Sequence, residues 1–161
     1  MAKSLFIFII LAMATVACFS QSGASANISA TISHPVGTQK INDMSFGNFV
    51  TSNAAGSIEL NTNSMRKSSG GVVLTGQEAV THATFNITGD FAYSITLPSE
   101  AITLKRNGGE ETMKVESFYF TPVVTTQNQL LAIGATLKVG ASQLPGNYNS
   151  VDALAVTVNY N

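Results

Sequence analysis

The chain ends in a stretch where hydrophobic and polar residues alternate. In an extended strand successive side chains point to opposite faces, so hydrophobic residues at every second position share one face. We expect that face to be buried, which would build the end of the chain into a sheet. The alternating residues in 151–161 are Leu154, Val156, Val158 and Tyr160.

The same period of two returns along most of the chain, and it predicts strands separated by turns rich in Gly, Asn and Pro. No segment has the 3.6-residue period of a helix, and charged residues make up only 11% of the chain. This pattern is typical of an antiparallel β-sandwich, with a closed barrel as the alternative. The predicted strands are 27–33, 57–61, 82–88, 92–97, 101–105, 112–120 and 135–139, followed by a turn at 145–149 and the last strand.

The first 26 residues have the features of a secretory signal peptide. Lys3 precedes the apolar run 5–19, and Ala24-Ser25-Ala26 has the small-x-small form that signal peptidase cleaves after. The run is shorter than the roughly 20 residues of a membrane-spanning helix. We therefore expect a signal helix at 1–26, a single β-sandwich domain at 27–161, and a secreted, periplasmic or cell-surface location. Lipid attachment at Cys18 is the alternative.

Composition narrows the possible functions further. Cys18 is the only cysteine and would leave with the signal, so no disulfide is expected despite the oxidising compartment. Cleavage would remove Lys3 and leave all nine acidic residues, so the mature chain would be slightly acidic. Nucleic acid is an unsuitable partner for such a surface.

Residues suited to catalysis or metal binding are few. His34 precedes Pro35, and His82 alternates with the hydrophobic residues that follow it and is expected to face away from the core. Neither histidine has a metal ligand at a useful spacing, and no serine stands in a Gly-x-Ser-x-Gly turn. The sequence therefore predicts no enzyme activity, no metal site and no cofactor.

Charged segments are interpreted as solvent-exposed. Residues 65–71 place Lys67 before the glycines, the wrong order for a phosphate-binding loop, so we interpret them as a surface loop. Glu110-Glu111 would lie at the tip of a hairpin, and Lys105-Arg106 at the end of a strand, where a specific anion site is the alternative.

A series of short motifs follows in order along the mature region. The motifs are Met44-Ser45-Phe46-Gly47, Gly70-Gly71-Val72-Val73-Leu74, Ala83-x-Phe85-x-Ile87-Thr88-Gly89, Tyr93-Ser94-Ile95-Thr96-Leu97-Pro98, Met113-x-Val115 with Phe118, Ile133-Gly134-Ala135-Thr136-Leu137-x-Val139-Gly140, Gly146-x-Tyr148 and Val156-Thr157-Val158-Asn159-Tyr160. With this series the chain resembles the bacterial domain-of-unknown-function family 4402. The resemblance implies a secreted all-β protein without an established activity, similar to spore-coat protein U and to chaperone–usher pilins.

The similarity to pilins implies an assembly mechanism. Pilin subunits are immunoglobulin-like sandwiches that lack one strand and receive it from the N-terminal extension of the next subunit. In this chain Ile28, Ala30 and Ile32 would form the donor strand, and the hydrophobic residues from Leu154 to Tyr160 would form the accepting sheet. The partners would be further copies or related subunits and a periplasmic chaperone.

Two alternatives accompany this hypothesis. Both terminal strands could pair within one complete sandwich. The protein could also be a monomeric binding module, for carbohydrate or a protein ligand, with Phe118, Tyr119 and Phe120 as its exposed aromatic residues. The chain has no tryptophan, a residue common in sugar-binding sites, and this absence favours the structural or adhesive subunit.

Overall fold

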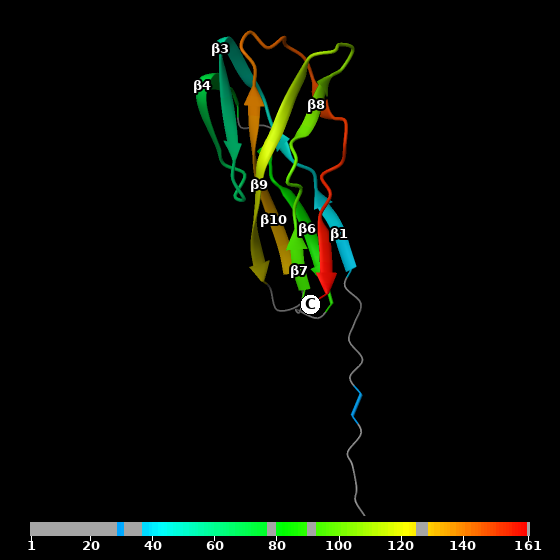
Figure 1. The fold of residues 1–161 in the computed structure, drawn as a ribbon. Helices are drawn as coiled ribbons and strands as arrows, with labels where there is room; N and C mark the ends of the chain where they lie inside the picture. The colour runs from blue at the N-terminus through cyan, green and yellow to red at the C-terminus, as the bar shows by residue number, and fades with distance from the viewer. Residues whose placement is uncertain (1–28, 31–36, 77–79, 90–92, 125–128, 161) are drawn as a thin grey trace, which may run out of the picture. The chain divides into compact units, whose positions relative to one another are not determined.

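A computed structural model of the chain describes residues 29–30, 37–76, 80–89, 93–124 and 129–160. These residues contain strands and no helix (Figure 1). The strands are β1 (Gly37–Asn42), β2 (Ser45–Phe46), β3 (Phe49–Leu60), β4 (Arg66–Leu74), β5 (Val80–Thr81), β6 (Ala83–Thr88), β7 (Tyr93–Thr96), β8 (Ile102–Arg106), β9 (Thr112–Val124), β10 (Gln129–Val139), β11 (Tyr148–Ser150) and β12 (Thr157–Tyr160).

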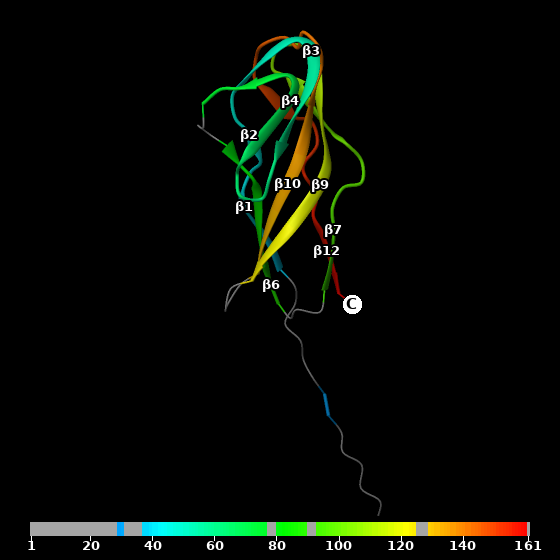
Figure 2. The same cartoon turned by 90° about the vertical axis from the view of Figure 1, so that its left-hand side faces the viewer.

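Strand β10 is the centre of an eight-stranded sheet in which all pairings are antiparallel. One side of β10 pairs with β9 along almost its full length. Its other side pairs with β6 through residues 129–133 and with β3 through residues 135–139. The sheet runs β1-β6-β10-β9-β8-β11, and β3 brings β4 as a branch. Two further pairs, β7 with β12 and β2 with β5, form small separate sheets (Figure 2).

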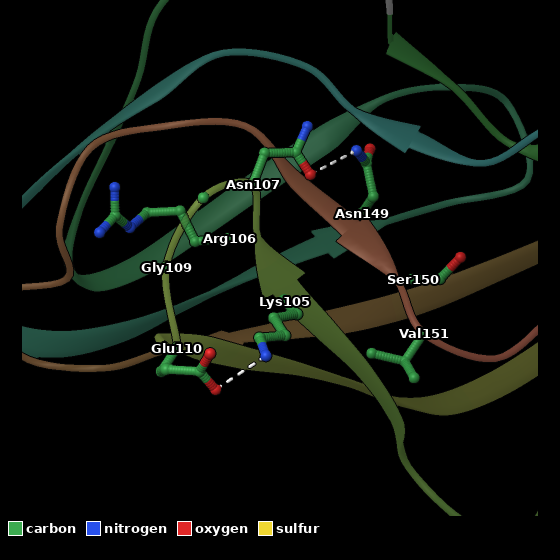
Figure 3. Close-up of a pocket in the computed structure, with 9 residues that line it drawn as sticks. Lys105, Arg106, Asn107, Gly109, Glu110, Asn149, Ser150 and Val151 are labelled. Atoms are coloured by element: carbon green, nitrogen blue, oxygen red, sulfur yellow. Dashed lines mark hydrogen bonds and ion pairs between the residues drawn. The ribbon is translucent and has the colours of Figure 1, made fainter.

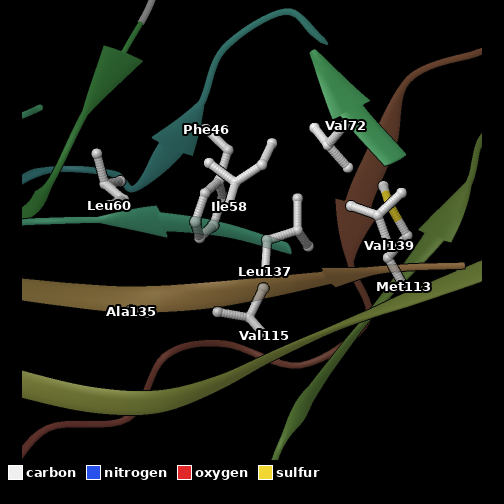
Figure 4. Close-up of a cluster of buried hydrophobic side chains, with 9 residues drawn as sticks. All are labelled: Phe46, Ile58, Leu60, Val72, Met113, Val115, Ala135, Leu137 and Val139. Atoms are coloured by element: carbon white, nitrogen blue, oxygen red, sulfur yellow. The ribbon is translucent and has the colours of Figure 1, made fainter. Parts of the chain in front are cut away.

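The inner face of β10 explains why this strand is central. Alternate residues from Leu131 to Val139 are hydrophobic and almost fully buried. The half of β10 that pairs with β3 contributes to what we call the large core cluster, in which side chains from β3, β4, β9 and β10 meet (Figure 4). The buried members of this cluster are Phe46, Ile58, Leu60, Val72, Met113, Val115, Ala135, Leu137 and Val139.

A second cluster, which we call the small core cluster, lies where β10 pairs with β6. The buried members are Ala83, Phe85, Ile87, Leu131 and Ile133. Half-buried residues of β7, of β12 and of the segments beside them pack against it. The two-stranded β7–β12 sheet therefore covers this part of the inner face.

Residues 66–71 are part of β4, so their interpretation as a surface loop was wrong. A bulge places residues 52–55 of β3 opposite Gly71. A Cβ atom on Gly71 would collide with the carbonyl oxygen of Ala54, and Gly70 has a φ of 66°. The glycines are thus required by the close approach of β3, and the Ser and Gly residues around them hide the alternation that would reveal a strand.

Arg66 at the start of β4 holds two connections in place. Its guanidinium donates to the carbonyl oxygens of Phe46 at 2.6 Å and Asn48 at 3.0 Å, and also to that of Gly76. Charge at this position therefore has a structural role, because it satisfies backbone carbonyls near the ends of β2 and β4.

Beyond Leu60 the chain leaves the edge of β10 and crosses its outer face. A Cβ on Gly134 would lie 2.7 Å from the Leu60 carbonyl oxygen and 2.5 Å from Cζ of Tyr119. The hydroxyl of Thr62 then reaches that of Thr121 on β9 at 3.3 Å. On neighbouring β6, Thr84 lies on the face opposite Phe85 and is equally buried, so the outer face is also covered at this position.

A bulge in β9 determines which of its aromatic residues face inward. Ser117 has a φ of 55°, and the register with β10 shifts between Gly134 and Thr136. After this shift Phe118 packs against both core clusters. The prediction that Phe118 is exposed was wrong, because a register shift cannot be read from alternation alone.

The predicted strand at 27–33 is described only at Ser29 and Ala30, and neither of them is in a strand. The signal segment, Ile28, Ile32 and His34 lie outside the described residues. The described residues from 37 to 160 belong to one compact unit.

Candidate functional site

The candidate site is the β7–β12 sheet with the segment that leads into β12. Of the C-terminal residues singled out above, Val158 and Tyr160 lie in β12, and Leu154 and Val156 lie just before it. The two strands pair in register, with Val158 opposite Ile95 and Asn159 opposite Ser94. The last strand was predicted over residues 151–161. In the structure β12 begins only at Thr157, and residues 151–156 are not in a strand. The turn predicted at 145–149 overlaps the short strand β11, which consists of residues 148–150.

The predicted inward face is confirmed for three of its four residues. Leu154, Val156 and Val158 all pack against the small core cluster, whereas Ala155, Thr157 and Asn159 between them are exposed. The side chain of Tyr160 lies outside the described residues, although its backbone pairs with Tyr93. All three packed residues are half-buried, so the cover that they provide is incomplete.

Substitution of Val156 tests this assignment of faces. Full burial of a valine contributes about 1.5–3 kcal/mol, so for the half-buried Val156 we expect Val156→Asp to reduce the free energy of unfolding by about 2 kcal/mol, including the cost of the charge. Thr157→Asp, on the exposed face, should change it by less than about 0.5 kcal/mol. Thermal melting of the two variants measures the difference, and a larger loss for Thr157→Asp would place the inward face one residue away.

Tyr93 of β7 joins the same packing. Its hydroxyl oxygen is buried and has no hydrogen-bond partner within the described part of the chain. Burial raises the pKa of this phenol above its usual value. Together with Ile95, the ring places apolar surface of β7 on the small core cluster.

The three aromatic residues proposed for ligand binding do not form one surface. Tyr119 lies beside Gly134 on the outer face of β9, whereas Phe120 is opposite the fully buried Ile133 and so belongs to the inner face. Their exposed fractions are almost equal, at 37% and 38%. Because Phe118 is inside and the other two point in opposite directions, a shared aromatic platform is not formed.

A shallow hollow of about 470 Å³ lies between the β8–β9 turn and β11 (Figure 3). Glu110 and Glu111 follow the turn as predicted. Lys105 pairs with Glu110 at 2.7 Å and Arg106 with Glu111 at 2.6 Å, and the hydrogen bond from Arg106 lowers the pKa of Glu111. Since each cation is neutralised by its neighbour, the hollow does not favour an anion.

His82 forms a local hydrogen bond. Its Nδ1 lies 2.8 Å from Oγ of Ser64, and the same oxygen accepts the backbone N–H of His82 at 3.2 Å. The ring is half-buried. Among the residues that the structure describes, no group of three or more His, Cys, Asp or Glu side chains could hold a metal ion.

Comparison with protein families gives a match over residues 36–160 to a domain of unknown function, DUF4402. The chain belongs to this family. The match starts one residue before β1 and extends to the last residue of β12, so the DUF4402 domain includes both small sheets. No curated protein and no solved structure matches the chain.

The described part of this DUF4402 protein contains no helix that is long and apolar enough to cross a membrane.

Proposed function

We propose that this DUF4402 protein is a secreted structural or adhesive subunit of the bacterial surface that assembles by exchanging a β-strand between copies. In this proposal the domain is an immunoglobulin-like sandwich with one layer incomplete. The observation that carries it is the β7–β12 sheet: two short strands cover the small core cluster, and the residues that they place on it remain half-buried.

Comparison of the sheet edges supports an acceptor at this small sheet. Soluble proteins protect exposed edges with charge, bulges or very short strands, because an unprotected edge pairs with other chains. Strand β4 carries Arg66, Lys67 and a kink at Gly70, and β1 carries Lys40 and a bulge. Strand β11 has only three residues. By contrast β7 and β12 contain no charged residue and no register shift.

The donor in this proposal is the segment 27–33, which precedes the described domain. It contains no charged residue, and Ile28, Ala30 and Ile32 recur at every second position. An added strand with this pattern would place its apolar face on the small core cluster, while its backbone would satisfy free N–H and C=O groups at the acceptor edge. Export through the signal segment would release this end, and a periplasmic chaperone would cover the edge until assembly.

Deletion of residues 27–33 tests the proposal. We expect the purified protein to form concentration-dependent oligomers, and the deletion variant to be a folded monomer by size-exclusion chromatography with light scattering. Ile28→Asp combined with Ile32→Asp should have the same effect. The matched control, Ser29→Asp with Thr31→Asp, places equal charge on the opposite face and should still assemble. A wild-type protein that is monomeric at all concentrations, or oligomers that persist after the deletion, would rule out strand exchange.

A further inference from the structure

The β7–β12 sheet has two edges, and the structure distinguishes between them. On the face of the large sheet that β7 and β12 cover, the strands follow the order β1-β6-β10-β9. Figure 1 shows β12 on the side of β1, and β7 on the side of β9. A strand added beside β12 would therefore approach β1, whereas one added beside β7 would approach β9.

The surface on the β1 side is polar. Lys40 is opposite Phe85 and Thr38 is opposite Ile87, so both share the inner face with these core residues. Both are exposed, and Lys40 forms an ion pair with Asp43 at 2.6 Å. An inward-pointing charge is one of the devices that keep other strands away from an edge. A further apolar strand at this position would have to displace the lysine or bury it.

The surface on the β9 side is apolar and uncovered. Phe120 is opposite Ile133 and Pro122 is opposite Leu131, so both face the same side as the small core cluster. Nevertheless Phe120 is 38% exposed, and Pro122 is also exposed, although Ile133 and Leu131 are fully buried. The layer that covers the cluster thus ends before it reaches β9.

We propose that the acceptor edge is the free edge of β7, where the segment 27–33 of a second copy adds as a third strand and covers Phe120. This inference rests on the strand exchange proposed above. Within the described residues β7 pairs with β12 alone, so its other edge is free to accept backbone hydrogen bonds. A strand added to β9 itself would extend the large sheet and leave the inner face of Phe120 open.

The short connection between the donor segment and β1 explains why the donor comes from another copy. Strand β1, which the donor segment precedes, is separated from β9 by β6 and β10. Three strand spacings of about 4.8 Å separate them by about 14 Å, and packed sheets lie a further 10 Å or so apart. Residues 34–36 join Ser33 to Gly37 by four Cα–Cα steps, which span at most about 14 Å when extended. This is less than the combined offset of about 17 Å, so a molecule's own segment 27–33 cannot pair along its full length with the outer edge of its β7.

Assembly of this kind is open-ended. The donor is the segment that precedes β1 in the chain and the acceptor is β7, so the two surfaces of one interface differ. A heterologous contact that does not close into a ring generates a filament. We therefore expect a range of sizes rather than a single dimer.

Substitution of neighbouring residues on opposite faces of β9 provides the first test. Phe120→Glu should weaken self-association at least about tenfold, because it places charge under the incoming strand. Tyr119→Glu changes a residue of equal exposure on the outer face and should leave the association constant within about threefold. Sedimentation of the full chain measures both values, and equal effects would contradict the proposal.

Disulfide trapping separates the two edges and does not depend on the stability of the Phe120 variant. Ser94 on β7 and Asn159 on β12 are direct cross-strand neighbours, and both are exposed. In a Cys18→Ser background, a donor with Ser29→Cys or Thr31→Cys is mixed with an acceptor that carries either Ser94→Cys or Asn159→Cys. We expect intermolecular disulfides with the Ser94→Cys acceptor and few with the Asn159→Cys acceptor.

The remaining outcomes are also decisive. Trapping at Asn159→Cys instead would overturn the choice of β7 and leave strand exchange intact. Oligomers that form without trapping at either position would overturn the β7 acceptor, and a protein that is monomeric and untrapped would overturn the proposed function as well.

Discussion

Leu137→Asn should unfold much of the protein. Leu137 is 1% exposed and lies in the large core cluster between Ile58 and Val115. The substitution forfeits about 2–3 kcal/mol of burial and adds about 1–3 kcal/mol for an amide without partners. A total of about 3–6 kcal/mol is a large share of the roughly 5–15 kcal/mol that stabilises a typical domain.

The neighbouring residue supplies the control for this prediction. Lys138→Asn introduces the same side chain on the outer face, where Lys138 is exposed and pairs loosely with Glu116 at 3.4 Å. An exposed pair of this kind contributes up to about 1 kcal/mol. Urea unfolding of both variants measures the two free energies, and a loss for Leu137→Asn as small as that for the control would show that this face is not the core.

Gly134→Val should have the second-largest effect, a loss of about 3 kcal/mol. The valine would occupy the space through which the Leu60 carbonyl and the ring of Tyr119 pass, at 2.7 and 2.5 Å from the new Cβ. Either the crossing segment or the tyrosine must move, and the Leu60 backbone is held by its pairing with Ala135.

Gly140→Val is the matched control, since Gly140 directly follows the same strand. The nearest atom to its new Cβ is Oε1 of Gln143 at 2.9 Å, the end of a flexible side chain that can move away. The control should lose less than about 1 kcal/mol. Thermal unfolding of the pair tests whether the crossing over β10 forms, and equal losses would mean that Gly134 is not a contact point.

Alternation in the sequence predicted those strands whose inner face alone is hydrophobic. It located β6, β7, β8, most of β9 and the second half of β10, and it assigned the inward residues of the C-terminal segment. It missed β4, because Ser and Gly stand where β3 bulges over the strand. Period two has no signal for such a contact, which depends on residues from another strand.

The sequence also did not predict which way the side chains of β9 point after its bulge. Ser117 takes a positive φ without being a glycine, and the register shift there turns Phe118 and Phe120 to the inner face, where Phe118 is partly buried. The candidate site was the part that the sequence predicted least well. A strand is an edge when one of its sides pairs with no other strand, and alternation within a single strand does not show this. The sequence could propose Val156 and Val158 as an assembly surface, but only the pairing of β7 and the exposure of Phe120 indicate which edge is open.

Hydrogen exchange of the β7 backbone amides tests the central claim, that the small sheet is completed by another copy. In the assembled protein the amides of 93–96 that face away from β12 should exchange slowly, and in the deletion variant without residues 27–33 they should exchange at least about tenfold faster. Amides of β10, which is paired on both sides, should be equally protected in both proteins. Equal protection of β7 in the two proteins would contradict the account, because it would mean that no strand from a neighbour had been added.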